Sequence, residues 1–467
     1  MPTTHETSTP NAVSAAGLLS RFRTVRQATT SLCAPLSPED MMVQSCPEAS
    51  PVKWHLAHTS WFFETFVLRD FLPGYQPFHP DFHWLFNSYY NSLGDMPEKK
   101  LRSSFSRPPI SDILAFRTHV DAAIGSLLGN VSPLPDEAVR RLSLGLEHEQ
   151  QHLELIATDI KHAFFTNPLH PPLQTSVWQP GSSIAPSLTW VDFSPGLIDI
   201  GASPDPGPAA FAFDNETPRH PVFLQPFSLA SRLVTCAEYL AFLDDNAYHR
   251  PELWLSEGWT TMRELGWEAP LYWRRDTTTP SGSIQSGWQI YTLYGFRPLD
   301  DLSETPVCHL SFFEADAFAR WSGARLPTEF EWEHAAISSD AYHPSQSRGP
   351  ASLPRVPDPL LPTANLLESN HLHPTPANPD PGLQQIFGDV WEWTSSPYTG
   401  YPGYRPQPGA QGEYNGKFMS SQIILRGGSC VTPATHIRAT YRNFFSPATR
   451  WQFSGLRLAK DTANPSS

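Results

Sequence analysis

The sequence has few cysteines, few charged residues and no long apolar run, and each shortage excludes a class of protein. Its five cysteines are few and odd in number, which argues against a disulfide scaffold and for the reducing cytoplasm. No stretch approaches the roughly 18 apolar residues of a membrane-spanning helix. The N-terminus also lacks the basic start and apolar core of a signal peptide. We therefore expect a cytoplasmic protein without a membrane partner.

Basic residues are also scarce. The chain has 32 Lys and Arg against 46 Asp and Glu, a net charge of −14. This balance argues against nucleic acid as a partner, because a phosphate backbone attracts basic surfaces. Apolar residues, in contrast, are abundant: 40% of the 467 residues are hydrophobic and 12% are aromatic, enough for a sizeable core. The 49 prolines favour turns and irregular loops.

The first part of the chain has the periodicity of long helices, after a polar segment over residues 1–14 that we expect to be a mobile tail. Four long helices over residues 15–166 predict an antiparallel four-helix bundle. The Pro- and Ser-rich residues 167–187 predict a linker. The segments with helical periodicity are residues 18–32, 53–72, 111–128 and 137–165.

The second part of the chain, residues 188–462, follows a different pattern. Short β-like runs alternate with Gly, Pro and Asn turns, and two short helices are predicted over residues 236–245 and 312–323. Prolines crowd residues 344–381 and predict a long irregular loop there. The expected fold class is therefore a four-helix bundle followed by a loop-rich α+β domain.

The sharpest local motif is His148-Glu149-Gln150-Gln151-His152 on the fourth predicted helix. At about 100° per residue, His148 and His152 lie about 40° apart, so both imidazoles can face one metal ion. Gln151 lies beside the same face. Apolar residues share that face, which indicates that it points inward, and two buried imidazoles without partners would be costly. The pattern therefore predicts a metal site.

A third ligand has to come from another helix. His58 is the best candidate, with His55 three residues earlier as the competitor, and only one of the two can point into the bundle. The motif also fits the HExxH signature of zinc proteases. The longer zincin pattern fails, because Leu155 stands where Gly is required and Thr158 where the third His is required. Spacing alone leaves zinc and Fe(II) open.

Paired tyrosines follow the second predicted helix. Tyr89 and Tyr90 stand in Asn-Ser-Tyr-Tyr-Asn. A phenol near a metal can transfer a proton. The alternative is an ordinary aromatic loop that packs at the domain junction, and the residues by themselves favour that alternative.

Several longer runs together resemble one family. LSPEDMMVQSCPEASPVKWHLAHTSWFFETFVL, FNSYYNSLG and LEHEQQHLELIATDIKH in the first half closely resemble the ergothioneine-biosynthesis sulfoxide synthases, the EgtB-type iron enzymes. The resemblance implies a DinB-like four-helix bundle followed by a domain similar to the formylglycine-generating enzymes and C-type lectins. Motifs such as GDVWEWTSSPY and LRGGSC in the second half fit that domain.

The resemblance also implies a reaction. Members of the family bind Fe(II) through three histidines, which correspond here to His58, His148 and His152. They use O2 to join a thiol sulfur to C2 of hercynine (trimethylhistidine), and the product is a sulfoxide. Gln151 matches the family glutamine that contacts the substrate imidazole. Tyr89 and Tyr90 match a subgroup whose paired tyrosines deliver a proton, which reverses the simpler interpretation of these residues.

The thiol donor is predicted from a short C-terminal segment. Members that use γ-glutamylcysteine carry Arg-Asn-Trp-Asp, whereas this chain has Arg442-Asn443-Phe444-Phe445 and no acidic residue for the donor's ammonium group. The resemblance is to members that take free L-cysteine. Arg442 and Asn443 could hold a carboxylate, and Phe444 and Phe445 could face the trimethylammonium group.

Other interpretations remain open from the sequence. An ovothiol-type synthase on the same fold would take histidine and usually carries an additional methyltransferase domain, and a selenoneine-type synthase would use a selenium donor. A zinc hydrolase built on HEQQH, with Glu149 as the base, belongs to a different class. A lectin-like binding module on a helical bundle would need no chemistry at all.

Overall fold

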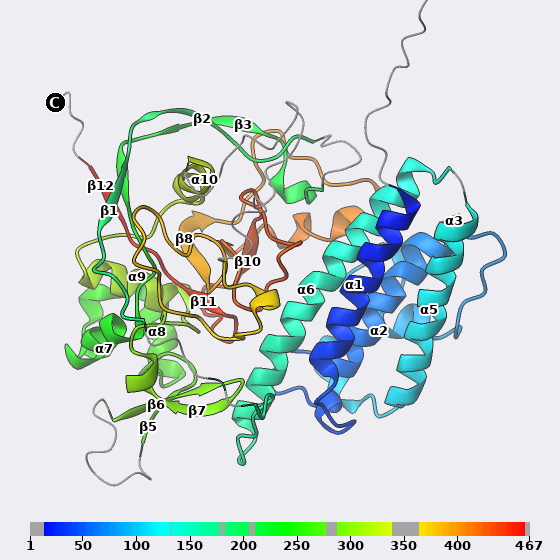
Figure 1. The fold of residues 1–467 in the computed structure, drawn as a ribbon, viewed down its shortest axis with the longest axis horizontal. Helices are drawn as coiled ribbons and strands as arrows, with labels where there is room; N and C mark the ends of the chain where they lie inside the picture. The colour runs from blue at the N-terminus through cyan, green and yellow to red at the C-terminus, as the bar shows by residue number, and fades with distance from the viewer. Residues whose placement is uncertain are drawn as a thin grey trace, which may run out of the picture.

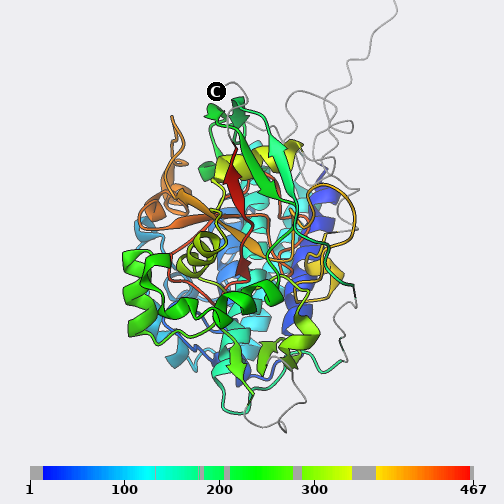
Figure 2. The same ribbon diagram turned by 90° about the vertical axis from the view of Figure 1, so that its left-hand side faces the viewer.

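The structure, a computed structural model, describes residues 14–131, 133–176, 178, 183–204, 211–276, 287–338 and 364–462. A helical bundle stands to the right in Figure 1, beside a second domain of short strands and helices. Figure 2 shows the second domain in front of the bundle. The predicted fold class is confirmed. Most of the predicted tail and residues 344–363 of the predicted loop lie outside the described residues.

The four predicted helices of the bundle are all present: α1 (Ala15–Cys33), α2 (Val52–Phe63), α5 (Ile110–Asn130) and α6 (Asp136–Thr166). Helix α1 begins after Ser14, whose hydroxyl accepts a hydrogen bond from Gly17 N. Among the described residues, no helix is both long and apolar enough to cross a membrane. Six shorter elements connect the long helices: η1 (Asp40–Met42), η2 (Glu64–Leu68), α3 (Arg69–Phe71), α4 (Phe82–Leu85), η3 (Asn91–Leu93) and η4 (Lys99–Ser104).

The second helix departs from the sequence prediction in one respect. Residues 53–72 were expected as one regular helix, but α2 passes into a π-helical turn, η2, before α3 ends it. The wider turn holds Glu64 in the interior, where its carboxylate accepts hydrogen bonds from the Tyr75 hydroxyl and from Phe78 N. Such turns are frequent near functional sites.

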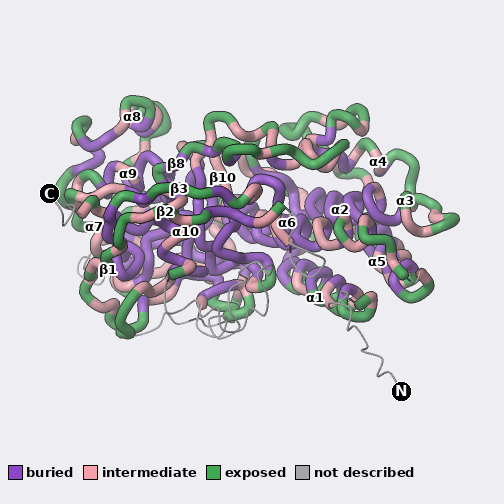
Figure 3. The backbone as a smooth tube through the Cα atoms, turned by 90° about the horizontal axis from the view of Figure 1, so that it is seen from above, coloured by how far each residue is buried: buried purple, intermediate pink, exposed green. Residues whose placement is uncertain are grey.

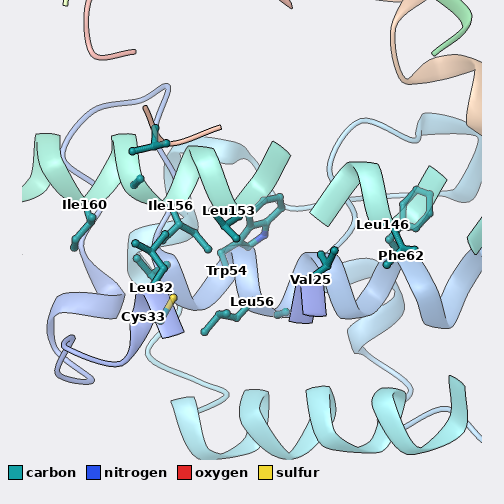
Figure 4. Close-up of a cluster of buried hydrophobic side chains, with 14 of the residues drawn as sticks. Val25, Leu32, Cys33, Trp54, Leu56, Phe62, Leu146, Leu153, Ile156 and Ile160 are labelled. Carbon is teal, nitrogen blue, oxygen red and sulfur yellow. The ribbon is translucent and has the colours of Figure 1, made fainter. Parts of the chain in front are cut away.

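Apolar side chains from α1, α2 and α6 fill the interior of the bundle (Figure 4). On α1 the buried positions recur three or four residues apart, as the periodicity predicts, whereas every residue of α2 is buried. The labelled members are Val25, Leu32, Cys33, Trp54, Leu56, Phe62, Leu146, Leu153, Ile156 and Ile160.

The described residues of the second domain form four small sheets. The central one has the order β10-β9-β8-β11 and contains β8 (Trp391–Pro397), β9 (Ile423–Arg426), β10 (Asn443–Phe445) and β11 (Ser454–Gly455). A second sheet has the order β1-β4-β12, in which β4 pairs with both the first and the last strand of the domain. It contains β1 (Trp190–Phe193), β4 (Phe227–Ala230) and β12 (Ala459–Asp461). The others are β2 (Gly196–Ile200) with β3 (His220–Leu224), and β5 (Trp273–Arg275), β6 (Trp288–Thr292) and β7 (Gly295–Pro298).

Both short helices predicted for this domain are confirmed, as α7 (Cys236–Asp244) and α9 (Phe312–Trp321). Each begins with a capping box, formed by Thr235 with Glu238 and by Ser311 with Glu314. Two further helices were not predicted: α8 (Ser256–Glu264) and α10 (Glu329–Ser338). Single turns complete the domain: η5 (Asp214–Glu216), η6 (Ala247–His249), η7 (Pro251–Leu253), η8 (Leu299–Leu302), η10 (Leu367–Ser369), η11 (Gly409–Glu413) and η12 (Gly416–Phe418).

The segment predicted as a linker is packed in part where the structure describes it. Leu173 is buried, and Gln174 N donates a hydrogen bond to Leu293 O at 3.0 Å. The ring of Trp178 stacks on Tyr294 with centroids 5.3 Å apart. These contacts attach the segment to the second domain.

Helix α6 is shared by the two domains, and Figure 3 shows it largely buried. One face packs in the bundle. The other contacts the second domain: Glu154 accepts hydrogen bonds from Trp391 and Ser429, and Lys161 Nζ donates to His309 Nε2 at 2.7 Å. Residues of α6 can therefore combine with side chains of both domains in one site.

Candidate active site

Three buried histidines from two helices of the bundle meet at one point. His58 comes from α2, and His148 and His152 come from α6. One nitrogen of each lies within 4.8 Å of the corresponding nitrogens of the other two. The ring centroids are 4.5 to 5.0 Å apart. This is the triad predicted from the sequence, and its spacing suits a shared metal ion.

The ring of His58 is held by its neighbours. Its Nδ1 donates a hydrogen bond to Phe86 O at 2.6 Å, and the ring lies between Trp54 and Trp61 with centroids 4.4 and 5.2 Å away. Because a carbonyl oxygen only accepts, the proton is on Nδ1 and the lone pair is on Nε2. Nε2 is buried and has no hydrogen-bond partner among the described residues. It is therefore available as a ligand.

His55, the competitor, is outside the triad and forms a hydrogen bond with one of its members, His152. Its Nε2 is 3.1 Å from Asp159 Oδ2, and its Nδ1 is 2.7 Å from Nδ1 of His152. A carboxylate accepts, so His55 donates through Nε2 and accepts through Nδ1 from His152. This leaves the lone pair of His152 on Nε2. The chain from Asp159 thus fixes the tautomer of a candidate ligand, and the choice between the two histidines falls on His58.

All three imidazoles of the triad are neutral. Burial lowers the pKa of His148 to about 3, and burial together with the neighbouring His148 lowers the pKa of His58 and His152 well below the usual value. Neutral imidazole is the form that binds metals. Both ring nitrogens of His148 also lack a hydrogen-bond partner within the described ranges. Buried unpaired nitrogens of this kind fit a metal site.

Glu149 points away from the triad. Its carboxylate accepts hydrogen bonds from Arg26 at 2.8 Å, from Arg117 at 2.9 Å and from Thr29 at 3.0 Å. Burial alone would raise its pKa, but the two guanidinium groups lower it to about 2. A general base of a zinc hydrolase has to reach water at the metal. This geometry argues against the zinc hydrolase interpretation.

A cavity of about 190 Å³ lies between α6 and the second domain, and His152 is in its wall. Aromatic rings and side-chain amides dominate its lining, and Glu154 supplies its carboxylate. Most of the predicted substrate residues are in the wall. The lining residues are Tyr89, Gln151, His152, Glu154, Leu155, Phe213, Asn215, Trp391, Tyr414, Asn415, Phe418, Tyr441, Arg442, Asn443, Phe444, Phe445 and Gln452.

The paired tyrosines differ in position. Tyr89 is half-buried in the cavity wall, with its ring 5.4 Å from that of Phe418. Tyr90 is buried in the bundle, where its ring packs against Trp61 and Phe66. Since Trp61 stacks on His58, Tyr90 is separated from the triad by one ring. Tyr89 is therefore the phenol of the pair with access to the cavity.

Arg442 is the predicted site residue whose surroundings do not match its predicted role. Its guanidinium makes two hydrogen bonds to Glu329, at 2.8 and 3.0 Å, and another to Asn215 O at 2.7 Å. Glu329 is buried and needs these donors to keep its charge. The prediction that Arg442 grips a substrate carboxylate is therefore not supported, because the side chain is already used within the protein.

The neighbours of Arg442 do face the cavity. Phe444 stacks on Tyr398 with ring centroids 4.0 Å apart, and Phe445 follows it on β10. The amide oxygen of Asn443 accepts a hydrogen bond from Phe444 N at 2.9 Å. The strand thus presents two aromatic rings and one amide to the cavity.

Comparison with known proteins gives the same two-part organisation. Residues 21–156 match the model of the DinB superfamily, and residues 189–462 match the sulfatase-modifying factor enzyme 1-like domain. The hercynine oxygenase of Mycolicibacterium smegmatis is 33% identical over 436 residues, which are 89% of this chain and 92% of that protein. The chain belongs to the hercynine oxygenase family.

Two further relatives support the assignment. The hercynine oxygenase of Mycobacterium tuberculosis is 30% identical, with 90% of this chain and 93% of that protein covered. A formylglycine-generating enzyme of Streptomyces coelicolor is 28% identical over 53% of this chain and 82% of its own length. The hercynine oxygenase family therefore accounts for both halves of the chain in this order.

Sequence reasoning missed several residues of this member of the hercynine oxygenase family. Tyr414 lies in the cavity wall with its ring centroid 5.6 Å from that of His148, and burial raises its pKa well above the ordinary value. Tyr441 accepts a hydrogen bond from Gln151 Nε2 at 2.6 Å. Tyr441 stands directly before the Arg442 segment, so its position was a usable signal. Tyr414 stands in no motif that marks it.

Proposed function

We propose that this chain is a sulfoxide synthase of ergothioneine biosynthesis, which uses Fe(II) and O2 to join L-cysteine to C2 of hercynine. The observation that carries the proposal is the buried triad of neutral imidazoles beside an aromatic cavity closed by the second domain. The atoms balance: the thiol and C2 hydrogens leave with one oxygen atom as water, and the other oxygen stays on sulfur. The product is hercynylcysteine sulfoxide.

His58, His148 and His152 would hold the iron. Three neutral nitrogen ligands leave coordination positions open, which suits a non-haem Fe(II) site as well as catalytic zinc. When bound, Fe(II) would supply redox chemistry with O2 and favour the thiolate form of the donor. The chain's own part is to exclude bulk water, which the burial of all three rings supports.

Hercynine would be bound by amide and aromatic groups of the cavity. Gln151 lies one residue before His152 on α6 and can reach the imidazole of the substrate. The trimethylammonium group cannot donate a hydrogen bond and is attracted to aromatic faces. Phe444 and Phe445 supply such faces, and Asn443 supplies a polar contact beside them.

Free L-cysteine is the thiol donor that the cavity fits better. γ-Glutamylcysteine carries a γ-glutamyl unit whose ammonium group and additional carboxylate need partners, while its cysteine nitrogen is an uncharged amide. Among the described lining residues, Glu154 is the acidic one, and both of its oxygens already accept hydrogen bonds, from Trp391, Ser429 and Thr432. Phe444 and Phe445 bring no charge to this part of the wall. A donor without the γ-glutamyl group therefore matches the lining.

The experiment is anaerobic reconstitution with Fe(II), followed by addition of O2, hercynine and either cysteine or γ-glutamylcysteine. Mass spectrometry identifies the product. We expect hercynylcysteine sulfoxide from free cysteine, and none when Zn(II) replaces Fe(II). Product from γ-glutamylcysteine and none from free cysteine would contradict the proposal that L-cysteine is the donor. Product from histidine or from a selenium donor, without reaction of hercynine and cysteine, would favour the ovothiol-type or selenoneine-type alternative.

We further propose that the tyrosine pair delivers the proton that favours C–S bond formation over oxidation of the thiol. Tyr89→Phe is expected to raise the ratio of cysteine sulfinate to sulfoxide by about 10² or more, the usual size of a general-acid contribution. Tyr90→Phe should have a smaller effect, because its ring is packed in the bundle. The product ratio is measured by mass spectrometry.

Tyr414→Phe tests the third nearby phenol in the same assay. An unchanged ratio in Tyr89→Phe, together with a shift in Tyr90→Phe, would assign proton delivery to Tyr90. A shift confined to Tyr414→Phe would remove the role from the pair. Iron content of each variant serves as the control, since none of the three residues belongs to the triad.

A further inference from the structure

A chain of hydrogen bonds crosses the domain interface and ends at Gln151. Gln151 Nε2 lies 2.6 Å from the Tyr441 hydroxyl, which lies 3.0 Å from His436 Nε2. His436 Nδ1 lies 2.5 Å from Glu147 Oε2, and Arg21 donates to the other oxygen of that carboxylate at 2.5 Å. Glu147, His436 and Tyr441 are 2, 1 and 3% exposed. The three middle members of the chain are therefore shielded from bulk water.

The order of donors and acceptors follows from the carboxylate end. A carboxylate only accepts, so His436 donates to Glu147 through Nδ1. In the neutral ring, Nε2 is then an acceptor, and the Tyr441 hydroxyl donates its proton to it. The phenol oxygen keeps its lone pairs for Gln151 Nε2. Each link thus fixes the direction of the next one.

The last link determines which end of the Gln151 amide faces the cavity. With Nε2 held by Tyr441, Oε1 points the other way, and this oxygen is buried without a hydrogen-bond partner in the part of the chain that is described. A buried carbonyl oxygen without a donor is costly. An N–H donor of a bound molecule would satisfy it. Gln151 lines the cavity, and the group that it leaves unpaired there is an acceptor rather than a donor.

We propose that Glu147, His436 and Tyr441 are positioning residues that hold the Gln151 amide with its oxygen toward the substrate, so that hercynine is bound through an imidazole N–H. This inference rests on the proposed function for the identity of the substrate. Glu147 and Gln151 are one turn apart on α6, and the second domain bridges them through His436 and Tyr441. Contact between the domains therefore completes the recognition of the imidazole.

The test begins with Tyr441→Phe, which keeps the ring and removes the oxygen that holds Gln151. Hercynine binding to the anaerobic Fe(II) protein, without thiol, is measured by calorimetry. We expect the Kd for hercynine to rise about tenfold, the effect of one lost buried hydrogen bond. The KM for cysteine should be unchanged. A purely structural defect would change the Kd for hercynine and the KM for cysteine together.

A matched control and a second variant distinguish the loss of this hydrogen-bond chain from the loss of any buried phenol. Tyr291→Phe removes another buried phenol of the second domain, which donates to Pro171 O, and should leave hercynine binding unchanged. His436→Leu removes the acceptor of the Tyr441 hydroxyl without altering the cavity wall. It should weaken hercynine binding in the same direction as Tyr441→Phe. It is the deciding variant if Tyr441→Phe does not fold.

Because Tyr441 itself lines the cavity, a double-mutant cycle with Gln151→Met separates positioning from direct contact. If Tyr441 acts through Gln151, Tyr441→Phe has no further effect on the Kd in the Gln151→Met background. A full tenfold effect in both backgrounds would overturn the inference. So would unchanged binding in Tyr441→Phe. If the unmodified protein neither binds nor converts hercynine, the proposed function fails instead.

Discussion

His152→Ala is expected to lose bound iron and all sulfoxide synthesis while the bundle stays folded. The triad offers three candidate nitrogen ligands, and removal of one leaves two, which lie on separate helices. His152 also borders the cavity, so truncation there leaves space that water can enter. The expected loss in the free energy of unfolding is about 1–3 kcal/mol, because a single truncation at a cavity wall rarely costs more.

The measurement combines iron content after reconstitution, product formation by mass spectrometry and thermal unfolding by circular dichroism. His119→Ala is the control. This histidine lies on α5 of the same bundle, where its ring bonds to Gln76 O and not to the triad. It should bind iron and react as the unmodified protein does. Full iron retention in His152→Ala would contradict the ligand assignment.

The pattern of one helix is enough to find two of the three candidate ligands. His148 and His152 are one turn apart on α6, and their separation does not depend on the rest of the fold. For the third, His58 was the best candidate, but the pattern could not exclude His55, because both lie on α2. What distinguishes them is Phe86 O, 28 residues from His58, and Asp159, 104 residues from His55.

The same limit explains Arg442. An Arg-Asn pair in a short motif suggests a group that binds anions, but its partner, Glu329, lies 113 residues earlier in the chain. Local sequence does not reveal which acid a buried arginine will meet. The wider fold shows the same contrast. The ends of three of the four long helices, α1, α5 and α6, were predicted to within three residues, whereas the two-residue strand β11 leaves no periodic signal.

Glu149→Gln is expected to destabilise the bundle strongly without removing the metal. The carboxylate is fully buried and lies between two guanidinium groups that are also buried. Its neutral replacement leaves Arg117 without its carboxylate partner, and Asp121 as the remaining carboxylate beside Arg26. Removal of one member of a buried ion pair costs about 3–5 kcal/mol, because the remaining charges stay desolvated. Thermal unfolding should shift to a clearly lower temperature.

Glu137→Gln is the matched control for this effect. It is the same substitution on the same helix, and Glu137 also pairs with two arginines, Arg140 and Arg141. Its side chain is 41% exposed, so water screens these pairs and their loss should cost no more than about 1 kcal/mol. The difference between the two variants measures the effect of burial, since charge, helix and chemical change are the same.

The same variant separates the remaining hydrolase interpretation from the proposed one. If Glu149 were a general base, Glu149→Gln would abolish catalysis and leave stability almost unchanged, because the residue would face an open site. The structure places its carboxylate against Arg26 and Arg117 instead. At a temperature where the variant is folded, sulfoxide formation per bound iron should therefore match that of the unmodified protein. Loss of activity without a change in the unfolding temperature would contradict this conclusion and would support a general-base role for Glu149.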